Sequence, residues 1–230
     1  MDTEHITRQP AVLFIHIPKT AGTSVSRLLQ TTPGVDIPLA PGWRPLNWRK
    51  RMSKHSCALE KQRFFGPSYL RSFKFSVVRN SWDWLWSFYS FIKFTNLNPD
   101  TGRIFRHTIY PIVKDLSFSE FVEFVTIESG LQKLPAARRM ASLGYQEFNQ
   151  YNFVHNLDGE ILVDRILRFE HIEDQLQQSL IELGFSPPSL PEVNKSEKFG
   201  KTYRDAYSPR TKNLVQNKFA IDIEHFRFEY

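Results

Sequence analysis

The sequence has few of the features that mark secreted, membrane-spanning or disordered proteins. Its 230 residues contain a single cysteine, Cys57, which excludes an internal disulfide and a cysteine-rich metal site. The best apolar run, residues 11–17, is interrupted by His16 and is far shorter than the roughly 18 residues of a membrane helix. Nothing in the first 20 residues has the charged start and long apolar core of a signal peptide. We therefore expect a cytoplasmic protein without a membrane span.

The composition is instead that of a folded domain. Hydrophobic residues make up 41% of the chain and charged residues 23%, and the aromatic residues are 20 Phe, 8 Tyr and 5 Trp. This supply of apolar side chains excludes a disordered chain and is ample for a buried core. We expect a single domain over residues 1–230, with a short N-terminal extension at residues 1–10.

Positive charge is concentrated in one part of the chain. The net charge is +6, but residues 44–79 contain ten Lys and Arg against one acid, Glu60, so this segment carries +9 and the remainder −3. Such a local excess indicates an anion-binding surface, although a solvated basic face explains it equally well. A second, independent feature has to decide between these two interpretations.

Segments of strand length alternate with helical patterns. Residues 11–17 form an apolar run between two prolines, which is typical of a strand buried on both faces of a parallel sheet. Residues 73–78 and 161–169 contain further strand-forming residues, and apolar residues at helical spacing follow each of the three segments. The alternation predicts an α/β fold with a central parallel sheet flanked by helices.

Several helix boundaries are marked in the sequence. Residues 117–120 form a capping-box pattern, and the apolar stripe over residues 172–183 ends at Gly184. Ser208 and Pro209 are typical of the cap and first turn of a last helix. The residues expected to face inward on this helix are Leu214, Val215, Phe219 and Ile223. The Pro/Gly-rich connector at residues 31–45 is expected to be irregular.

The segment after the first strand is suited to hold an anion. Residues 18–24 read P-K-T-A-G-T-S, a loop of small residues with one lysine that leads into a helix. Backbone N–H groups of such a loop point into the turn, and the helix N-terminus adds partial positive charge. The loop is not a Walker A motif, because Lys19 precedes Gly22 instead of following the glycines.

This loop resembles the 5′-phosphosulfate loop of sulfotransferases. Residues 79–87 read R-N-S-W-D-W-L-W-S and are similar to the family's R-N-P-W-D-R-x-x-S segment, in which the Arg and the Ser hold the 3′-phosphate of the donor. The resemblance extends from about residue 11 to the C-terminus. It is closest to the carbohydrate sulfotransferases that include heparan sulfate 2-O-sulfotransferase and many bacterial relatives. Ser81 replaces the usual Pro and Trp84 a common Arg, and neither change falls on a phosphate ligand.

The resemblance implies a P-loop-like, nucleotide-binding sulfotransferase fold with a site for the donor 3′-phosphoadenosine 5′-phosphosulfate (PAPS). It gives Lys19 a catalytic role as well, because a fixed positive charge stabilises the leaving group. The donor-binding residues that it implies are Lys19, Thr20, Ala21, Gly22, Thr23, Ser24, Arg79, Ser87, Lys195, Ser196, Tyr203 and Arg204.

His55 is the general base that the resemblance implies. It lies within the basic segment and looks like part of the family's histidine block between the two donor motifs. An imidazole with its ordinary pKa of about 6.5 is suited to take the proton of an acceptor hydroxyl. His107, His155, Glu60 and Glu170 stay open as alternatives.

Three other residues have plainer interpretations. His16 is expected to be a core histidine, because it lies inside an apolar run. Asp83 is expected to be a first-turn acid that complements the helix dipole. Trp84 is expected in the core, with stacking on a sugar or on adenine as the alternative.

The predicted reaction is transfer of a sulfuryl group from PAPS to an acceptor hydroxyl on a carbohydrate by in-line displacement. The nucleotide product is 3′-phosphoadenosine 5′-phosphate. No metal requirement is predicted, since the sequence has no visible Asp/His ligand cluster. The expected partner is a small-molecule or glycan acceptor, which is acidic if the basic segment receives it, and no nucleic acid is expected.

Three other functions remain as alternatives. An ATP-dependent small-molecule kinase would share the phosphate loop, but the chain lacks the Walker lysine position and an obvious Mg²⁺ carboxylate. A basic nucleic-acid-binding α/β protein needs basic and aromatic residues interleaved on an exposed surface. A non-catalytic donor-binding protein would keep the motifs without transfer. The acceptor and the oligomeric state are left open by the sequence.

Overall fold

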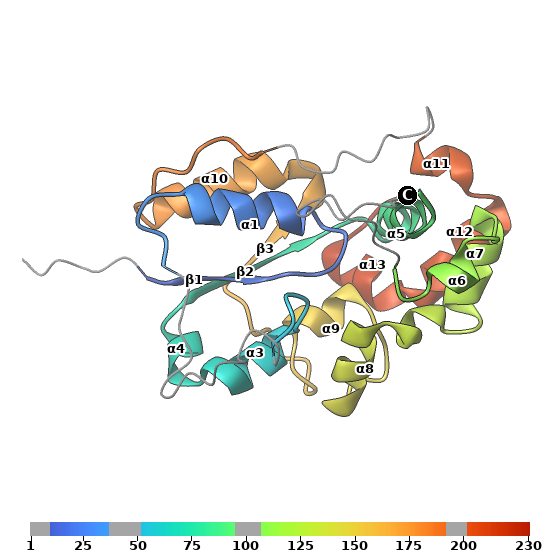
Figure 1. Ribbon diagram of the computed structural model, residues 1–230, viewed down its shortest axis with the longest axis horizontal. Helices are drawn as coiled ribbons and strands as arrows, with labels where there is room; N and C mark the ends of the chain where they lie inside the picture. Colours follow the sequence, from blue (N-terminus) through green and yellow to red (C-terminus); the bar gives the residue numbers. More distant parts are fainter. Residues whose placement is uncertain (1–9, 37–51, 95–106, 192–201) are drawn as a thin grey trace, which may run out of the picture.

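The protein is built on a parallel sheet, as seen in a computed structural model that describes residues 10–36, 52–94, 107–191 and 202–230. In these residues the strands are β1 (Val12–Ile15), β2 (Phe73–Val78) and β3 (Arg165–Arg168). They are paired in the order β1-β2-β3, and both pairs are parallel (Figure 1). The predicted α/β class is therefore confirmed, with a first strand shorter than residues 11–17.

Helices cover both faces of the sheet. Because side chains alternate along a strand, Val12 and Phe14 of β1 belong to one hydrophobic cluster, and Leu13 and Ile15 belong to the other. Helices α1 (Gly22–Thr31) and α10 (Ile172–Glu182) pack on the first face, and α3 (Ala58–Phe65) and α4 (Pro67–Leu70) lie on the opposite side (Figure 1). The result is a three-layer arrangement.

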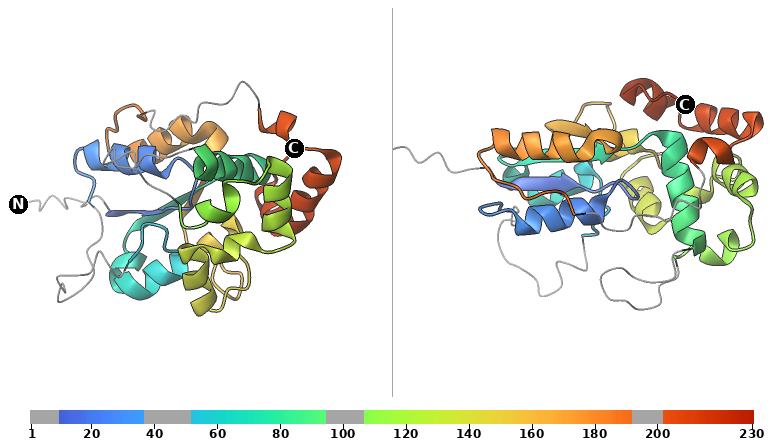
Figure 2. Two further views of the ribbon diagram at one scale, coloured as in Figure 1. Left: turned by 45° about the vertical axis from the view of Figure 1, so that its right-hand side comes forward. Right: turned by 90° about the horizontal axis from the view of Figure 1, so that it is seen from above.

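Helix α5 (Ser81–Phe94) extends the larger cluster beyond the sheet, and Figure 2 shows it between the sheet and the C-terminal helices. The remaining elements are α6 (Tyr110–Val113), α7 (Phe118–Thr126), η1 (Gly130–Lys133), α8 (Pro135–Ser142), α9 (Gln150–Val154), η2 (Phe169–His171), α11 (Tyr203–Ala206), α12 (Pro209–Lys218) and α13 (Ala220–Phe226). Of the helices described, none has the length and apolar character needed to cross a membrane.

The predicted capping box at the start of α7 is present. The Ser117 hydroxyl accepts the Glu120 N–H at 3.3 Å, and the Glu120 carboxylate accepts the Ser117 N–H at 2.7 Å.

The prediction of one last helix is wrong, because α12 and α13 are separated at Phe219. The buried Phe219 ring packs edge-on against Trp84, and Asp222 on the next turn is buried as well. Most of the 31–45 connector lies outside the described residues.

Candidate active site

Two strand-to-helix junctions meet at the carboxyl edge of the sheet. β1 leads through residues 16–21 into α1, and β2 leads through Arg79 and Asn80 into α5. Because β1 and β2 are adjacent and parallel, both junctions lie at the same edge, where ligands of α/β proteins bind. The Arg79 Nη1 group donates to the Lys19 carbonyl at 3.1 Å. The structure thus brings together the two motifs that the sequence separates by about 60 residues.

The backbone of the first loop is held in an unusual conformation. Lys19 and Ala21 both have positive φ angles, 67° and 60°, which non-glycine residues seldom adopt. The buried Thr20 hydroxyl between them donates to the Ile17 carbonyl at 2.9 Å. Helix α1 then begins at Gly22 with no acid in its first turn. The N–H groups of Gly22, Thr23 and Ser24 therefore belong to a helix N-terminus that favours an anion.

Gly22 is required by its contact with His16. A Cβ atom at position 22 would lie 1.6 Å from the His16 Nε2 atom, and a rigid ring in a packed site cannot yield that much. His16 is buried and stacks on Phe14, as expected for a core histidine. The lack of a side chain at Gly22 thus leaves room for the His16 ring as well as for the approach of a ligand.

Lys19 points along α5, where its Nζ atom lies 3.8 Å from the centre of the Phe91 ring. Burial lowers the pKa of Lys19 from 10.5 to about 7, and the positive charges of Arg79 and Lys54 act in the same direction. Close to neutral pH this amine is therefore divided between its charged and neutral forms. A bound anion would restore the charge, since it favours the protonated amine.

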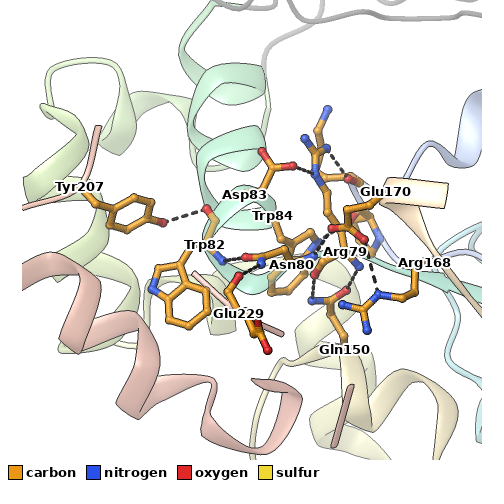
Figure 3. Close-up of polar contacts among 12 residues, drawn as sticks. Arg79, Asn80, Trp82, Asp83, Trp84, Gln150, Arg168, Glu170, Tyr207 and Glu229 are labelled. Carbon is orange, nitrogen blue, oxygen red and sulfur yellow. Dashed lines mark hydrogen bonds and ion pairs between the residues drawn. The ribbon is translucent and has the colours of Figure 1, made fainter. Parts of the chain in front are cut away.

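Arg79 is held from several directions (Figure 3). Its Nε group forms a 2.8 Å ion pair with Asp83, one helical turn further on, and its guanidinium lies 3.9 Å from the centre of the Phe169 ring. Asp83 is a first-turn acid of α5, as expected, and it also orients the arginine. Together with the bond to the Lys19 carbonyl, these contacts fix the direction in which the guanidinium faces.

Asn80, and not Ser81, caps helix α5. The Asn80 side-chain oxygen accepts the Trp82 N–H at 3.1 Å, and its amide donates to the Glu229 carbonyl at 2.6 Å. The Asn80 N–H in turn donates to Glu170 at 2.9 Å. The Ser81 hydroxyl is buried and has no hydrogen-bond partner among the described residues, so the serine that replaces the family's proline does not cap the helix.

Trp84 ties the helix to the phosphate loop. Its side chain has 0% exposure, and its Nε1–H donates to the Pro18 carbonyl at 2.7 Å. The ring packs against Phe88, Phe148 and Phe219, so the alternative of stacking on a sugar or adenine is wrong. Trp84, which replaces the family's arginine, thus connects α5 to the first loop through its hydrogen bond to the Pro18 carbonyl.

The other predicted donor residues lie around the same helix end. Ser87 is one turn beyond Asp83 on α5 and is 5% exposed. Tyr203 and Arg204, at the start of α11, reach a cavity of about 300 Å³ beside the first turn of α5. The residues that line this cavity are Asn80, Asp83, Arg168, Glu170, Tyr203, Arg204, Arg227 and Glu229. Lys195 and Ser196 lie outside the described residues.

His55 lies against the end of β1. Its Nδ1 atom is 3.1 Å from the His16 carbonyl oxygen, and the two imidazole rings are 4.4 Å apart. A carbonyl oxygen only accepts hydrogen bonds, so Nδ1 carries the proton and the Nε2 lone pair is left to act as a base. The partly buried His55 is therefore in the tautomer that a general base requires.

The expectation that His55 keeps its ordinary pKa is wrong. Burial, together with the charges of Lys54, Arg139 and Lys61, lowers the pKa of His55 to about 3, and the hydrogen bond to the His16 carbonyl opposes this shift. The ring stays neutral until the pH falls to about 3. In a histidine-labelled NMR titration of the free protein we expect no protonation of His55 between pH 8 and about 4. A transition near pH 6.5 for this ring would contradict the assignment.

The alternative bases lie in different surroundings. His107 packs edge-on against Phe91, and burial together with the charge of Lys19 lowers its pKa. Glu60 faces Arg139 across 3.7 Å. Glu170 accepts the Asn80 N–H in the second junction. His155 stacks on the Tyr151 ring at 3.8 Å, beside α9 and α13.

The basic segment does not form one continuous basic and aromatic face. Lys61 is buried and donates to the Phe14 carbonyl at 2.7 Å, and Lys74 pairs with Asp164 at 2.9 Å. Two aromatic residues of the same segment, Phe65 and Tyr69, are buried too. Residues 44–51 lie outside the described part of the chain. In the described part, the interleaved surface that the nucleic-acid-binding alternative needs is not present.

Fold and site define an α/β protein with two strand-to-helix junctions, one of them a phosphate-loop type of turn, at the ends of two parallel strands. A comparison with protein families matches residues 5–229 to the sulfotransferase family. The chain therefore belongs to the sulfotransferase family, and the kinase alternative is set aside. No curated protein matches the chain. Family membership implies PAPS as the donor.

Proposed function

We propose that the protein transfers the sulfuryl group of PAPS to a hydroxyl group of a carbohydrate by in-line displacement. The acceptor oxygen forms a bond to sulfur as the bond from sulfur to the bridging oxygen of the 5′-phosphate breaks. The acceptor proton passes to a base, and the nucleotide leaves as 3′-phosphoadenosine 5′-phosphate. The observation that carries the proposal is the 3.1 Å contact between Arg79 and the Lys19 carbonyl, since it joins the two phosphate motifs into one site.

The first loop would hold the 5′ end of the donor. Three kinds of hydrogen-bond donor lie together at the end of β1. They are the loop backbone over residues 19–21, the first-turn N–H groups of α1 and the Lys19 ammonium. Negative charge grows on the bridging oxygen as the sulfuryl group departs, and donors fixed in advance stabilise that charge without reorganisation. Lys19 supplies the full positive charge once the anionic donor has raised its pKa.

The second junction would hold the 3′-phosphate. Arg79 lies just before α5, where it pairs with Asp83 of the first turn, and Ser87 follows Asp83 by one turn of the helix. Tyr203 and Arg204 would add contacts from α11, and Lys195 and Ser196 are proposed by resemblance alone. This division of the donor between two junctions explains why each motif carries its own cation, Lys19 in the first and Arg79 in the second.

His55 would act as the base through Nε2. With its pKa of about 3, His55 is unprotonated in the free protein at neutral pH, but it is a weak base. The negative charges of the bound donor oppose those of Lys54, Arg139 and Lys61, and so raise its proton affinity at the moment of transfer. The proposed reaction uses no metal. Within the described residues, no three His, Cys, Asp or Glu side chains cluster closely enough to hold a metal ion.

Calorimetry and a transfer assay test the proposed function together. We expect 3′-phosphoadenosine 5′-phosphate to bind much more tightly than ATP or a single-stranded oligonucleotide. With sulfur-labelled PAPS and a panel of oligosaccharides, label should pass to at least one acceptor. Tight nucleotide binding without transfer to any acceptor would favour a non-catalytic donor-binding protein, and preference for ATP would contradict the proposal.

Replacement of Arg79 by alanine should weaken donor binding mainly through the 3′-phosphate. A charge-assisted hydrogen bond contributes about 1.5–3 kcal/mol, so we expect about a tenfold to hundredfold loss of affinity for 3′-phosphoadenosine 5′-phosphate. Adenosine 5′-phosphate, which lacks the 3′-phosphate, should lose much less. Arg71→Ala is the matched control, because Arg71 is exposed and precedes β2 at the opposite edge of the sheet. Equal losses for both nucleotides would contradict the assignment.

An acidic acceptor is the partner that the basic segment favours. Lys54, next to His55, and Arg63 on α3 are both exposed. At saturating donor we therefore expect the acceptor KM to rise steeply with salt, because exposed charges are screened over about 10 Å at 0.1 M salt. A KM that is independent of salt would indicate a neutral acceptor instead.

A further inference from the structure

We propose that Gln150 and Asp222 form a positioning unit that sets the backbone of Arg79 and thereby the recognition of the donor's 3′-phosphate. The inference rests on the proposed function, because it concerns how that site is built. Neither residue belongs to the two sequence motifs. Both come from helices at a distance in the chain, α9 and α13.

At the end of β2, the Gln150 side chain forms the backbone hydrogen bonds that a neighbouring strand would otherwise form. Arg79 is the first residue beyond β2, where its N–H and C=O groups have left the sheet. The Gln150 Oε1 atom accepts the Arg79 N–H at 2.8 Å, and the Gln150 Nε2 group donates to the Arg79 carbonyl at 2.7 Å (Figure 3). One side-chain amide thus holds both polar groups of the arginine backbone. Gln150 is completely buried, so water is a poor substitute for either bond.

Asp222 fixes Gln150 in turn. One carboxylate oxygen accepts the Gln150 N–H at 3.0 Å, and the other accepts the Tyr151 N–H at 2.7 Å. These two N–H groups begin α9, which Asn149 caps, so the carboxylate helps to fix the first turn of the helix from which the Gln150 side chain extends. Asp222 itself has no exposed surface.

The burial of Asp222 is costly for folding by itself. Burial raises its pKa from 3.8 to about 7, although the two N–H bonds act in the opposite direction. A buried carboxyl group that is destabilised in this way is a poor choice for packing alone. The two N–H bonds offset part of that cost, and one of them holds the backbone of Gln150 in place.

The consequence reaches the guanidinium of Arg79. Its contacts with Asp83, Phe169 and the Lys19 carbonyl all depend on where the Arg79 backbone leaves the sheet. A shift of about 1 Å at such a point is enough to misalign a binding group. Gln150 and Asp222 touch no part of the proposed donor directly, and they are therefore positioning residues.

The test compares nucleotides with and without a 3′-phosphate. The affinities of 3′-phosphoadenosine 5′-phosphate and adenosine 5′-phosphate are measured by calorimetry for the full chain and for Gln150→Ala. We expect the preference for the 3′-phosphorylated nucleotide to fall about tenfold, the value of one hydrogen bond lost, with little change for adenosine 5′-phosphate. Asp222→Asn should shift the preference in the same direction by less, because its amide still accepts one N–H.

Gln175→Ala is the matched control. Gln175 accepts the N–H of Arg168 at 2.7 Å, so it supports the end of β3 as Gln150 supports the end of β2. Its replacement should leave the preference unchanged. If Gln150→Ala does not fold, Gln150→Met decides, since methionine has a similar length and fills the buried space but lacks both the donor and the acceptor for the Arg79 backbone.

The outcomes separate the two proposals. A folded Gln150 variant with the preference of the unaltered protein, or with equal losses for both nucleotides, overturns the positioning role. An unaltered protein that shows no preference for the 3′-phosphate overturns the proposed function itself, and the positioning role with it. A selective loss in Gln150→Ala and its absence in Gln175→Ala supports both.

Discussion

Replacement of His55 by alanine is expected to lower the turnover number by about 10²–10⁴-fold, the usual contribution of a positioned general base. Donor binding should survive, because His55 contacts the end of β1 and not the two phosphate motifs. The measurements are single-turnover transfer from labelled PAPS and the calorimetric affinity for 3′-phosphoadenosine 5′-phosphate. A loss confined to transfer is the signature of a base.

Two further variants keep this prediction specific. His107→Ala and Glu60→Gln remove the alternative bases that lie near Lys19 and Arg139. Each should retain far more transfer activity than His55→Ala. A larger loss of transfer activity in either variant would show that the replaced residue is the base. Loss of nucleotide binding in His55→Ala would instead show that His55 supports the loop through the His16 carbonyl.

Replacement of Lys19 by alanine is expected to lower turnover by about 10²–10³-fold, as for other fixed donors that meet developing charge. The reason is the position of Lys19 in the loop at the start of α1, where the leaving 5′-phosphate would lie. Transfer at saturating donor measures the effect. A turnover number close to that of the unaltered protein would remove Lys19 from the mechanism.

The pH dependence of donor binding gives a second measure of Lys19. Its pKa is lowered to about 7 in the free protein, and the anionic donor raises it. Binding therefore takes up a proton above pH 7, and the affinity for 3′-phosphoadenosine 5′-phosphate should fall by up to about tenfold per pH unit as the pH rises. Calorimetry in buffers of different ionisation enthalpy detects the proton.

Lys19→Arg is the control for this dependence. An arginine side chain stays protonated throughout this range, so the affinity should become almost independent of pH between 7 and 9. A decline that persists in Lys19→Arg would show that another group takes up the proton. His107 is the neighbour to examine next, since the charge of Lys19 acts on it directly.

Local sequence was sufficient for the parts of the protein that depend on short-range patterns. The strand at residues 73–78, the capping box at residues 117–120 and the end of α10 before Gly184 are as expected. The two phosphate motifs were also visible, because each is a contiguous strand–loop–helix segment. The family match over residues 5–229 confirms what the motifs indicated.

Features that depend on distant partners were missed or misjudged. Trp84 is in the core as expected, but its bond to the Pro18 carbonyl was not predicted, because it exists only where β1 and β2 are neighbours. Gln150 had no motif to mark it, since its partner Arg79 lies 71 positions away. The helix break at Phe219, whose ring packs edge-on against Trp84, has no Gly or Pro near it to mark it in the sequence.

The sequence by itself determined the class of fold, the family and the two motifs that we propose bind the donor's phosphates, since these depend on contiguous residues. Only the tertiary structure decided that Lys19 and Arg79 share one site and that His55 is neutral. It also decided that a glutamine and a buried aspartate support the arginine. The physical reason is that burial, hydrogen-bond geometry and the pKa values that depend on them are set by residues far apart in the chain.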